Sequence, residues 1–266
     1  EDQKTVERNE QLFFEKYGEG VSPEHHHLIR DVESCYISSS LAVGLAKKYD
    51  ADLHVFHLTT EKEMELFSEG DVIGKKITAE VCVHHMHFEE SSYAELGNQI
   101  KCNPSIKYES DRQALIQALL NNKIDIIATD HAPHTWDEKM MRYQEAPAGL
   151  PLVQHGLQIL MDFYHQGILS LETIVEKTSH NVAKRFQVKD RGYIREGCFA
   201  DIVVIDSDKK YEVTNDNILY KCAWSPFLGK TFNSSIYMTI CNGHIAFQDG
   251  QLNNDIPLGM QIEFDR

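Results

Sequence analysis

Residues 124–135 read IDIIATDHAPHT, and this stretch indicates both the fold class and the chemistry. Its first half is an apolar run typical of a buried strand, and Asp130, His131 and His134 follow where that strand should end. Functional groups of parallel α/β proteins collect at strand ends, and Pro133 stiffens this loop. A carboxylate followed by two imidazoles suits metal ligation or proton transfer, although a turn capped by Asp130 with solvated histidines is the simpler alternative.

The chain on both sides of this stretch alternates short apolar runs with amphipathic helices. We expect strands at residues 53–58, 77–83, 100–102 and 124–129, and helices at residues 1–20, 32–48, 61–68, 110–121, 152–165 and 171–177. Such alternation predicts a parallel sheet in an α/β fold. Because a (β/α)8 barrel needs eight strands and about 250 residues, four parallel strands indicate either a smaller open sheet or half of a barrel.

After residue 185 the pattern becomes β-rich. The runs ADIVVID, SIYMTICNG and HIAFQDG are apolar, and Asn242-Gly243 and Asp249-Gly250 are strong signals for tight hairpin turns. We therefore predict two domains: a partial α/β barrel at residues 1–187 and a small β-rich unit at residues 188–266.

The composition excludes several classes of protein. The formal net charge of -15 disfavours nucleic acid and anionic membranes as partners. No window approaches the roughly 20 apolar residues of a membrane span, and the charged first residues, EDQKTVERNE, do not resemble a signal peptide. The six cysteines form no C-x-x-C pair and lie mostly in apolar runs, so we expect buried, reduced thiols and a cytoplasmic location.

Further polar side chains follow apolar runs elsewhere. His57 ends the run LHVFH before a capped helix, and Asn103 ends a short run before Pro104. The segment VHHMHF contains three imidazoles, but in a strand His84 would point away from the other two, so a structural role is the simpler interpretation. A Pro- and Gly-rich loop at residues 145–151 could offer backbone groups to a ligand. Taken singly, this loop and the Asn-Pro turn are more simply explained as ordinary turns and loops that connect secondary-structure elements.

Taken in order, these segments resemble dihydroorotases of the bacterial type, in the amidohydrolase superfamily. The resemblance covers nearly the whole chain and rests on LHVFHLTT, ITAEVCVHH, KCNPSIKYESDRQALIQALLNNKIDIIATDHAPHT, PAGLPLVQHGL, TSHNVAKRF, GCFADIVVID and SPFLGKTFNSSIYMTICNGHIAF. It implies the reversible hydrolysis of dihydroorotate to N-carbamoyl-aspartate in pyrimidine biosynthesis. It also implies the C-terminal half of a TIM-type (β/α)8 barrel of the metal-dependent hydrolase class, followed by a small β-sandwich unit.

The resemblance implies a metal centre. His57 and Asp130 match metal ligands of the family, and Asp130 also matches the carboxylate that shuttles the proton during catalysis. The implied cofactor is Zn²⁺, with two ions in the complete enzyme. The resemblance also makes a homodimer plausible.

The resemblance also implies a site for a small substrate. His134 matches the histidine that holds the substrate carboxylate, and Asn103 matches the asparagine that binds the pyrimidine ring. The backbone of Ala148 and Gly149 matches the loop that contacts the ring amide. These four residues are therefore the expected substrate-binding residues.

The sequence departs from the family pattern in two places. The family's NPPLR segment is here NPSIK, at residues 103–107, which affects the fine substrate contacts. No H-x-H pair followed by Arg occurs in the expected place, and Glu1-Asp2 resembles the end of the family's H-C-E-D segment. We therefore expect a truncated chain that lacks the N-terminal metal ligands and is inactive in isolation. Two alternatives stay open: a hydrolase of the dihydropyrimidinase or allantoinase type, and a non-catalytic dihydroorotase-like scaffold.

Overall fold

The computed structural model describes residues 1–253 and 259–265. These residues form two compact units. One contains Glu1–Gln154 with Ile218–Pro226, and the other contains His155–Asn217 with the chain from Phe227 onward. None of the helices among the described residues is long and apolar enough to cross a membrane. The division into domains at residues 187 and 188 stays a prediction.

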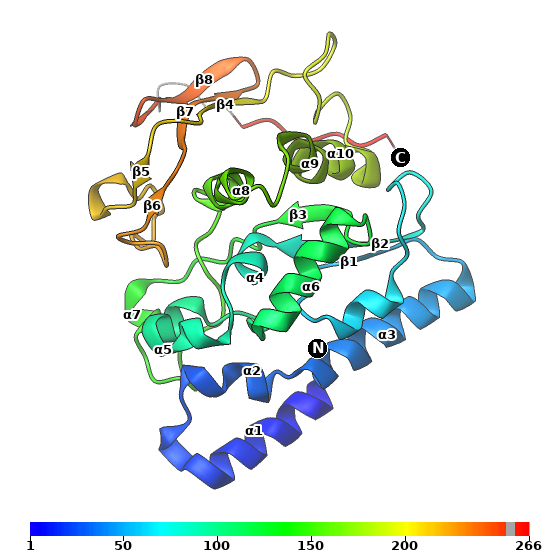
Figure 1. Ribbon diagram of the computed structural model, residues 1–266, viewed down its shortest axis with the longest axis vertical. Helices are drawn as coiled ribbons and strands as arrows, with labels where there is room; N and C mark the ends of the chain where they lie inside the picture. Colours follow the sequence, from blue (N-terminus) through cyan, green and yellow to red (C-terminus); the bar gives the residue numbers. More distant parts are fainter. Residues whose placement is uncertain (254–258, 266) are drawn as a thin grey trace. The chain divides into compact units, whose positions relative to one another are not determined.

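The described part of the first unit contains a parallel sheet of three strands (Figure 1). The strands are β1 (Leu53–Val55), β2 (Ile77–Cys82) and β3 (Ile126–Ala128), and β2 lies in the middle. The register pairs Leu53 with Ile77 and Glu80 with Ile126. Residues 79, 81 and 82 of β2 are all fully buried, as expected for a parallel strand that is covered on both faces. The predicted α/β class with a parallel sheet is confirmed for this unit.

The predicted strand at residues 100–102 is wrong. A 3-10 turn, η5 (Gly97–Ile100), leads into this segment, and the next carbonyl groups bond to side chains and to a distant loop. Lys101 O accepts the N–H of Gly149 at 2.8 Å and Nζ of Lys139 at 3.1 Å. Cys102 O lies 2.8 Å from Nε2 of His26. Carbonyl groups that are satisfied in this way do not form a ladder with a neighbouring strand.

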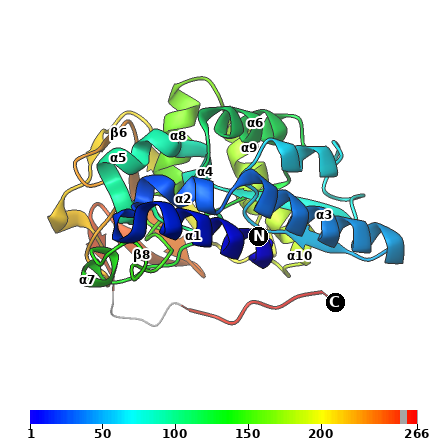
Figure 2. The same cartoon turned by 90° about the horizontal axis from the view of Figure 1, so that it is seen from below.

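Most predicted helices of the first unit are present, and side-chain caps mark where they begin. Asp2 accepts the N–H of Thr5 at the start of α1, and Asp31 accepts the N–H of Ser34 at the start of α3. The helices are α1 (Gln3–Tyr17), α2 (His26–Ile29), α3 (Val32–Tyr49), α4 (Val83–His87), α5 (Tyr93–Leu96), α6 (Glu109–Leu120) and α7 (Trp136–Lys139). The helix expected at residues 61–68 is only a 3-10 turn, η3 (Lys62–Leu66). Helix α1 lies beside α2 and α3 (Figure 2), and α4 lies beside α6.

The second unit combines helices with antiparallel strands. The helices are α8 (Gly156–His165), α9 (Leu171–Val175) and α10 (Asn181–Phe186), with a π-helical turn at Glu176–His180. The strands β4 (Ile202–Asp206), β7 (Ser235–Cys241), β8 (His244–Gln248) and β9 (Gln251–Leu252) form one sheet, and β5 (Tyr211–Glu212) pairs with β6 (Thr231–Phe232). Both predicted hairpin turns are confirmed. At each turn the two central residues have positive φ, which suits the Asn-Gly and Asp-Gly pairs.

An ion pair is buried where β2 and β3 begin. Nζ of Lys75 lies 2.8 Å from Oδ1 of Asp125, and the two side chains are only 7% and 1% exposed. The second carboxylate oxygen of Asp125 accepts the N–H of Ala79 at 3.0 Å. The pair therefore joins the entry to β2 with the entry to β3.

We expect Asp125→Ala to lower the free energy of unfolding by about 3 kcal/mol or more, because a nearly buried ammonium loses its carboxylate. The matched control is Lys76→Ala, which removes an ion pair with Asp50 whose side chains are 53% and 82% exposed. The Lys76→Ala variant should lose less than about 1 kcal/mol of the free energy of unfolding. Urea denaturation of both variants measures the difference, and equal losses would contradict the importance of the buried pair.

Three imidazoles are buried in the described part of the first unit, on His26, His84 and His85. Burial lowers the pKa of His26 and of His85 well below the usual 6.5. Burial, assisted by the nearby His57, lowers the pKa of His84 to about 3. All three are therefore neutral in the folded protein at neutral pH.

These shifts make the first unit sensitive to acid. Each neutral histidine makes its full contribution to the free energy of unfolding above pH 6.5. This contribution is lost as the pH falls from 6.5 toward the pKa of the folded state, because in this range only the unfolded chain takes up the proton. We expect the free energy of unfolding to fall by up to about 1.4 kcal/mol per histidine and pH unit in this window. Urea denaturation at several pH values measures it. His84→Leu should flatten the profile and the exposed His244→Leu should not; identical profiles for all three proteins would refute the assignment.

Candidate functional site

The carboxyl ends of the parallel strands meet at one edge of the sheet, and each end carries a group able to bind a metal or move a proton. His57 lies two residues beyond β1 and Asp130 two residues beyond β3, while Cys82 ends β2 between them. Neighbouring strands are about 4.8 Å apart, so the chain segments that carry His57 and Asp130 leave strands about 10 Å apart. The topology thus brings the two expected metal ligands to the same edge of the sheet.

His57 and Asp130 share an unusual backbone conformation. Their φ angles are 40° and 47°, in the left-handed region that side chains other than glycine rarely adopt. Tertiary contacts hold the chain beyond each of them: Leu58 donates its N–H to Glu80 O at 2.9 Å, and His131 forms a bridge with Leu150. Both residues therefore sit at abrupt turns off a strand end, a geometry that often positions functional side chains.

The turn after β2 corrects the interpretation of the segment VHHMHF. The chain does not continue as a strand but enters α4 directly after Cys82, so His84 and His85 are both buried, with ring centroids 4.0 Å apart. The structural role expected for them stays open, but the strand alternation on which that expectation rested is wrong. The available signal was their position, since they follow an apolar run as His57 and Asp130 do.

Electrostatic interactions connect the side chains at this edge. Burial is the main cause of the low pKa of His84, and the charge of His57 lowers this pKa further. Burial and the charge of Glu80 raise the pKa of the Cys82 thiol, and Asp130 adds to the effect. His57 and Asp130 therefore both act on groups at the end of the central strand.

The expected substrate-binding residues come together in a second cluster. Nε2 of His134 donates a hydrogen bond to Ala148 O at 3.1 Å. Gly149 has φ +136°, and a Cβ atom built there would lie 2.4 Å from Ala132 O. Ala148 and Asn103 line one cavity of about 330 Å³. The loops that carry all four predicted residues are thus in contact, and only glycine fits at position 149.

Two buried lysines hold this loop in place. Nζ of Lys139 donates to the carbonyl oxygens of Pro147 and Gly149, both at 2.9 Å, in addition to its bond with Lys101 O. Nζ of Lys101 donates to Tyr143 O and Ala146 O, both at 2.6 Å. Burial lowers the pKa of each lysine to about 8. The sequence offered no signal for this role, because the acceptors are backbone atoms.

His57 lies in a different cavity from Asn103. It lines a space of about 130 Å³ together with Cys35, Glu63 and Pro104, whereas Asn103 lines the larger space. Asn103 and Pro104 are consecutive, so one dipeptide borders both cavities. Asp130 and His134 line neither of these two. The structure therefore brings the expected metal ligands and the expected substrate-binding residues to neighbouring loops, not to a single pocket.

Sequence comparisons identify relatives of this chain. Residues 42–246 match the model of the Amidohydrolase family. The chain is similar to the dihydroorotase of Clostridium acetobutylicum, with 35% identity over 207 residues that cover 77% of this chain and 49% of the relative. It is also similar to the dihydroorotase of Streptococcus pneumoniae, with 32% identity over 237 residues that cover 87% and 55%. The chain spans about half the length of the curated relatives it matches.

Solved structures with a similar fold include hydantoinases. The L-hydantoinase (dihydropyrimidinase) from Arthrobacter aurescens superposes with a TM-score of 0.86 at 20% identity, over 95% of this chain and 57% of that one. A D-hydantoinase superposes with a TM-score of 0.82 at 20% identity, over 94% and 56%. At this identity the likeness concerns the fold alone. The matched family model covers most of the sequence, and the chain therefore belongs to the amidohydrolase family.

Proposed function

We propose that the protein of which this chain forms part or all is a dihydroorotase, which hydrolyses dihydroorotate reversibly to N-carbamoyl-aspartate in pyrimidine biosynthesis. The observation that carries the proposal is the position of His57 and Asp130, each two residues beyond a strand end, at the same carboxyl edge of one parallel sheet. The identity of about 35% to dihydroorotases supports this substrate over that of the hydantoinases, which resemble the chain at 20%.

The proposed architecture is the C-terminal half of a TIM-type (β/α)8 barrel followed by a small β-sandwich, with domains at residues 1–187 and 188–266. The parallel β1-β2-β3 sheet with its intervening helices supports the barrel half. The antiparallel four-stranded sheet and the β5–β6 pair support the β-rich unit. We also propose a homodimer in the cytoplasm, and the six free cysteines are compatible with a reducing compartment.

The donor set at the sheet edge fits zinc. An imidazole and a carboxylate are ligands that Zn²⁺ takes in catalytic sites, so His57 and Asp130 would hold it, with two ions in the complete enzyme. When bound, the metal would polarise the amide carbonyl and lower the pKa of a water molecule to about 7. Catalytic zinc takes about three protein ligands and keeps one position open, so further ligands would come from outside this pair.

The chain's own residues supply positioning and proton transfer. Asp130 would accept a proton from the attacking water and return it to the leaving ring nitrogen. Asn103 would donate to the ring, and His134 would hold the substrate carboxylate. The N–H and C=O of Gly149 already bond to Lys101 O and to Nζ of Lys139. Gly149 would therefore contribute by letting the backbone approach the ring, next to Ala148.

Asp130→Asn in the intact protein should lower kcat for dihydroorotate hydrolysis about 100-fold or more, because the amide cannot accept the proton. Steady-state kinetics measures this, with circular dichroism to confirm folding. The matched control is Asp137→Asn, an exposed carboxylate a few residues along the same segment, which should leave kcat unchanged. Equal activity of the two variants would remove Asp130 from the mechanism. Turnover of dihydrouracil in preference to dihydroorotate would favour a dihydropyrimidinase.

Gly149→Ala should raise the KM for dihydroorotate more than it lowers kcat. Its Cβ would meet Ala132 O at 2.4 Å and force the substrate-binding loop to shift. The matched control is Gly44→Ala in α3, where no atom lies within 4 Å, and this variant should keep KM and gain roughly 0.5–1 kcal/mol of stability. An unchanged KM in the Gly149 variant would show that the loop does not contact the substrate.

A further inference from the structure

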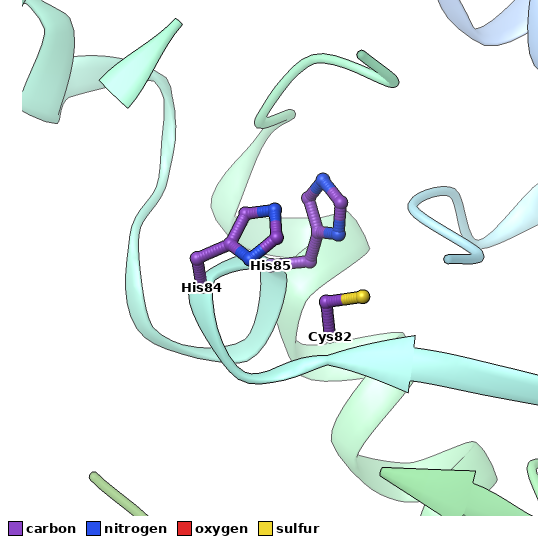
Figure 3. A group of neighbouring side chains, drawn as sticks. All are labelled: Cys82, His84 and His85. Atoms are coloured by element: carbon purple, nitrogen blue, oxygen red, sulfur yellow. The ribbon is translucent and has the colours of Figure 1, made fainter. Parts of the chain in front are cut away.

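A compact group of potential metal ligands lies at the turn from β2 into α4. Cys82, His84 and His85 each offer one ligand atom, and these atoms all lie within 4.8 Å of one another (Figure 3). All three side chains are buried, and none of them was assigned a role in the proposed hydrolysis. A thiol and two imidazoles are ligand types typical of zinc sites.

His84 is buried without the hydrogen bonds that such a group normally makes. Within the described residues neither of its ring nitrogens has a partner, and its side chain is fully buried. A buried polar atom left without a partner costs about 1–3 kcal/mol. Because burial keeps the imidazole neutral, one of its two nitrogens carries a lone pair that faces no donor.

The hydrogen bond of His85 determines its tautomer. Nε2 lies 3.0 Å from Pro104 O, and a carbonyl oxygen only accepts, so Nε2 carries the proton. Nδ1 therefore carries the lone pair, and Nδ1 is buried without a partner among the described residues. Metal-binding histidines are commonly oriented in this way, by a carbonyl that accepts from the second ring nitrogen.

We propose that Cys82, His84 and His85 bind a thiophilic divalent cation of the zinc class, with a fourth position left for water or another ligand. Thiolate and imidazole ligands favour zinc over hard cations such as Mg²⁺ or Ca²⁺. Binding displaces the Cys82 proton to solvent as the Sγ–metal bond forms. The site uses neither His57 nor Asp130. Through the bond of His85 to Pro104 O, it also supports the dipeptide that borders both cavities.

Cobalt binding to the metal-stripped full chain tests this site. Co²⁺ replaces zinc readily, and only thiolate-bound Co²⁺ gives a strong sulfur-to-metal charge-transfer band in the near ultraviolet. The wild-type chain should develop this band at one equivalent, and added Zn²⁺ should remove it. Cys82→Ser should abolish the band, and His84→Asn should weaken Co²⁺ affinity at least about 10-fold.

Matched variants separate this site from its surroundings. Cys102→Ser removes a buried thiol whose Sγ lies 3.8 Å from Nε2 of His85, on the protonated side of the ring, and it should keep the band. The variants His57→Asn and Asp130→Asn should also keep the charge-transfer band, even if they abolish turnover by the intact protein. The cobalt test therefore distinguishes failure of this site from failure of the proposed function. Absence of the band in the wild-type chain, or a band that survives Cys82→Ser, overturns the proposal. If the serine variant fails to fold, an unchanged Co²⁺ affinity of His84→Asn overturns it instead.

Discussion

The parallel pairing of β1, β2 and β3 is the constraint on which the rest of the first unit depends. Parallel strands run in the same direction, so their carboxyl ends share one edge, and residues that are far apart in sequence meet there. The register matters as well, because a slip of one residue would turn every side chain to the other face. The buried Lys75–Asp125 pair lies where two of these strands begin, and it helps to keep their ends aligned.

The sequence predicted correctly those helices and turns whose signals lie within a few neighbouring residues. Helices α3 and α6 begin near the expected residues, and the Asn-Gly and Asp-Gly turns form hairpins, because caps, periodicity and turn chemistry act within a few residues. The strand at residues 100–102 failed for a non-local reason. Its short apolar pattern is compatible with a strand. Its carbonyl groups, however, accept hydrogen bonds from Lys139, His26 and the backbone of Gly149. The side chains that bond to these carbonyl groups lie 38 and 76 residues away in the sequence. A pattern read over a few neighbouring residues cannot indicate such partners.

The candidate site shows the same limit. His57 and Asp130 could be singled out from sequence because each follows an apolar run, and the structure brings them to one edge. Their functional roles stay proposals. His84 and His85 were assigned a structural role because strand alternation would separate them, whereas the immediate start of α4 after Cys82 brings both rings into the interior. A single change of backbone state, from strand to helix, thus decides whether two imidazoles are neighbours.

Charge at the substrate loop follows from how its lysines are held. The chain has a net charge of -15, which would repel an anionic substrate such as dihydroorotate. Lys101 and Lys139 are buried near the cavity that Asn103 and Ala148 line, and the hydrogen bonds described for them go to carbonyl oxygens. Carbonyl dipoles stabilise an ammonium without cancelling its charge, whereas a carboxylate partner would neutralise it. Two cations held in this way, with Arg30 lining the same cavity, oppose the negative charge of Glu10 and of the chain as a whole at the loop where the proposed substrate would bind.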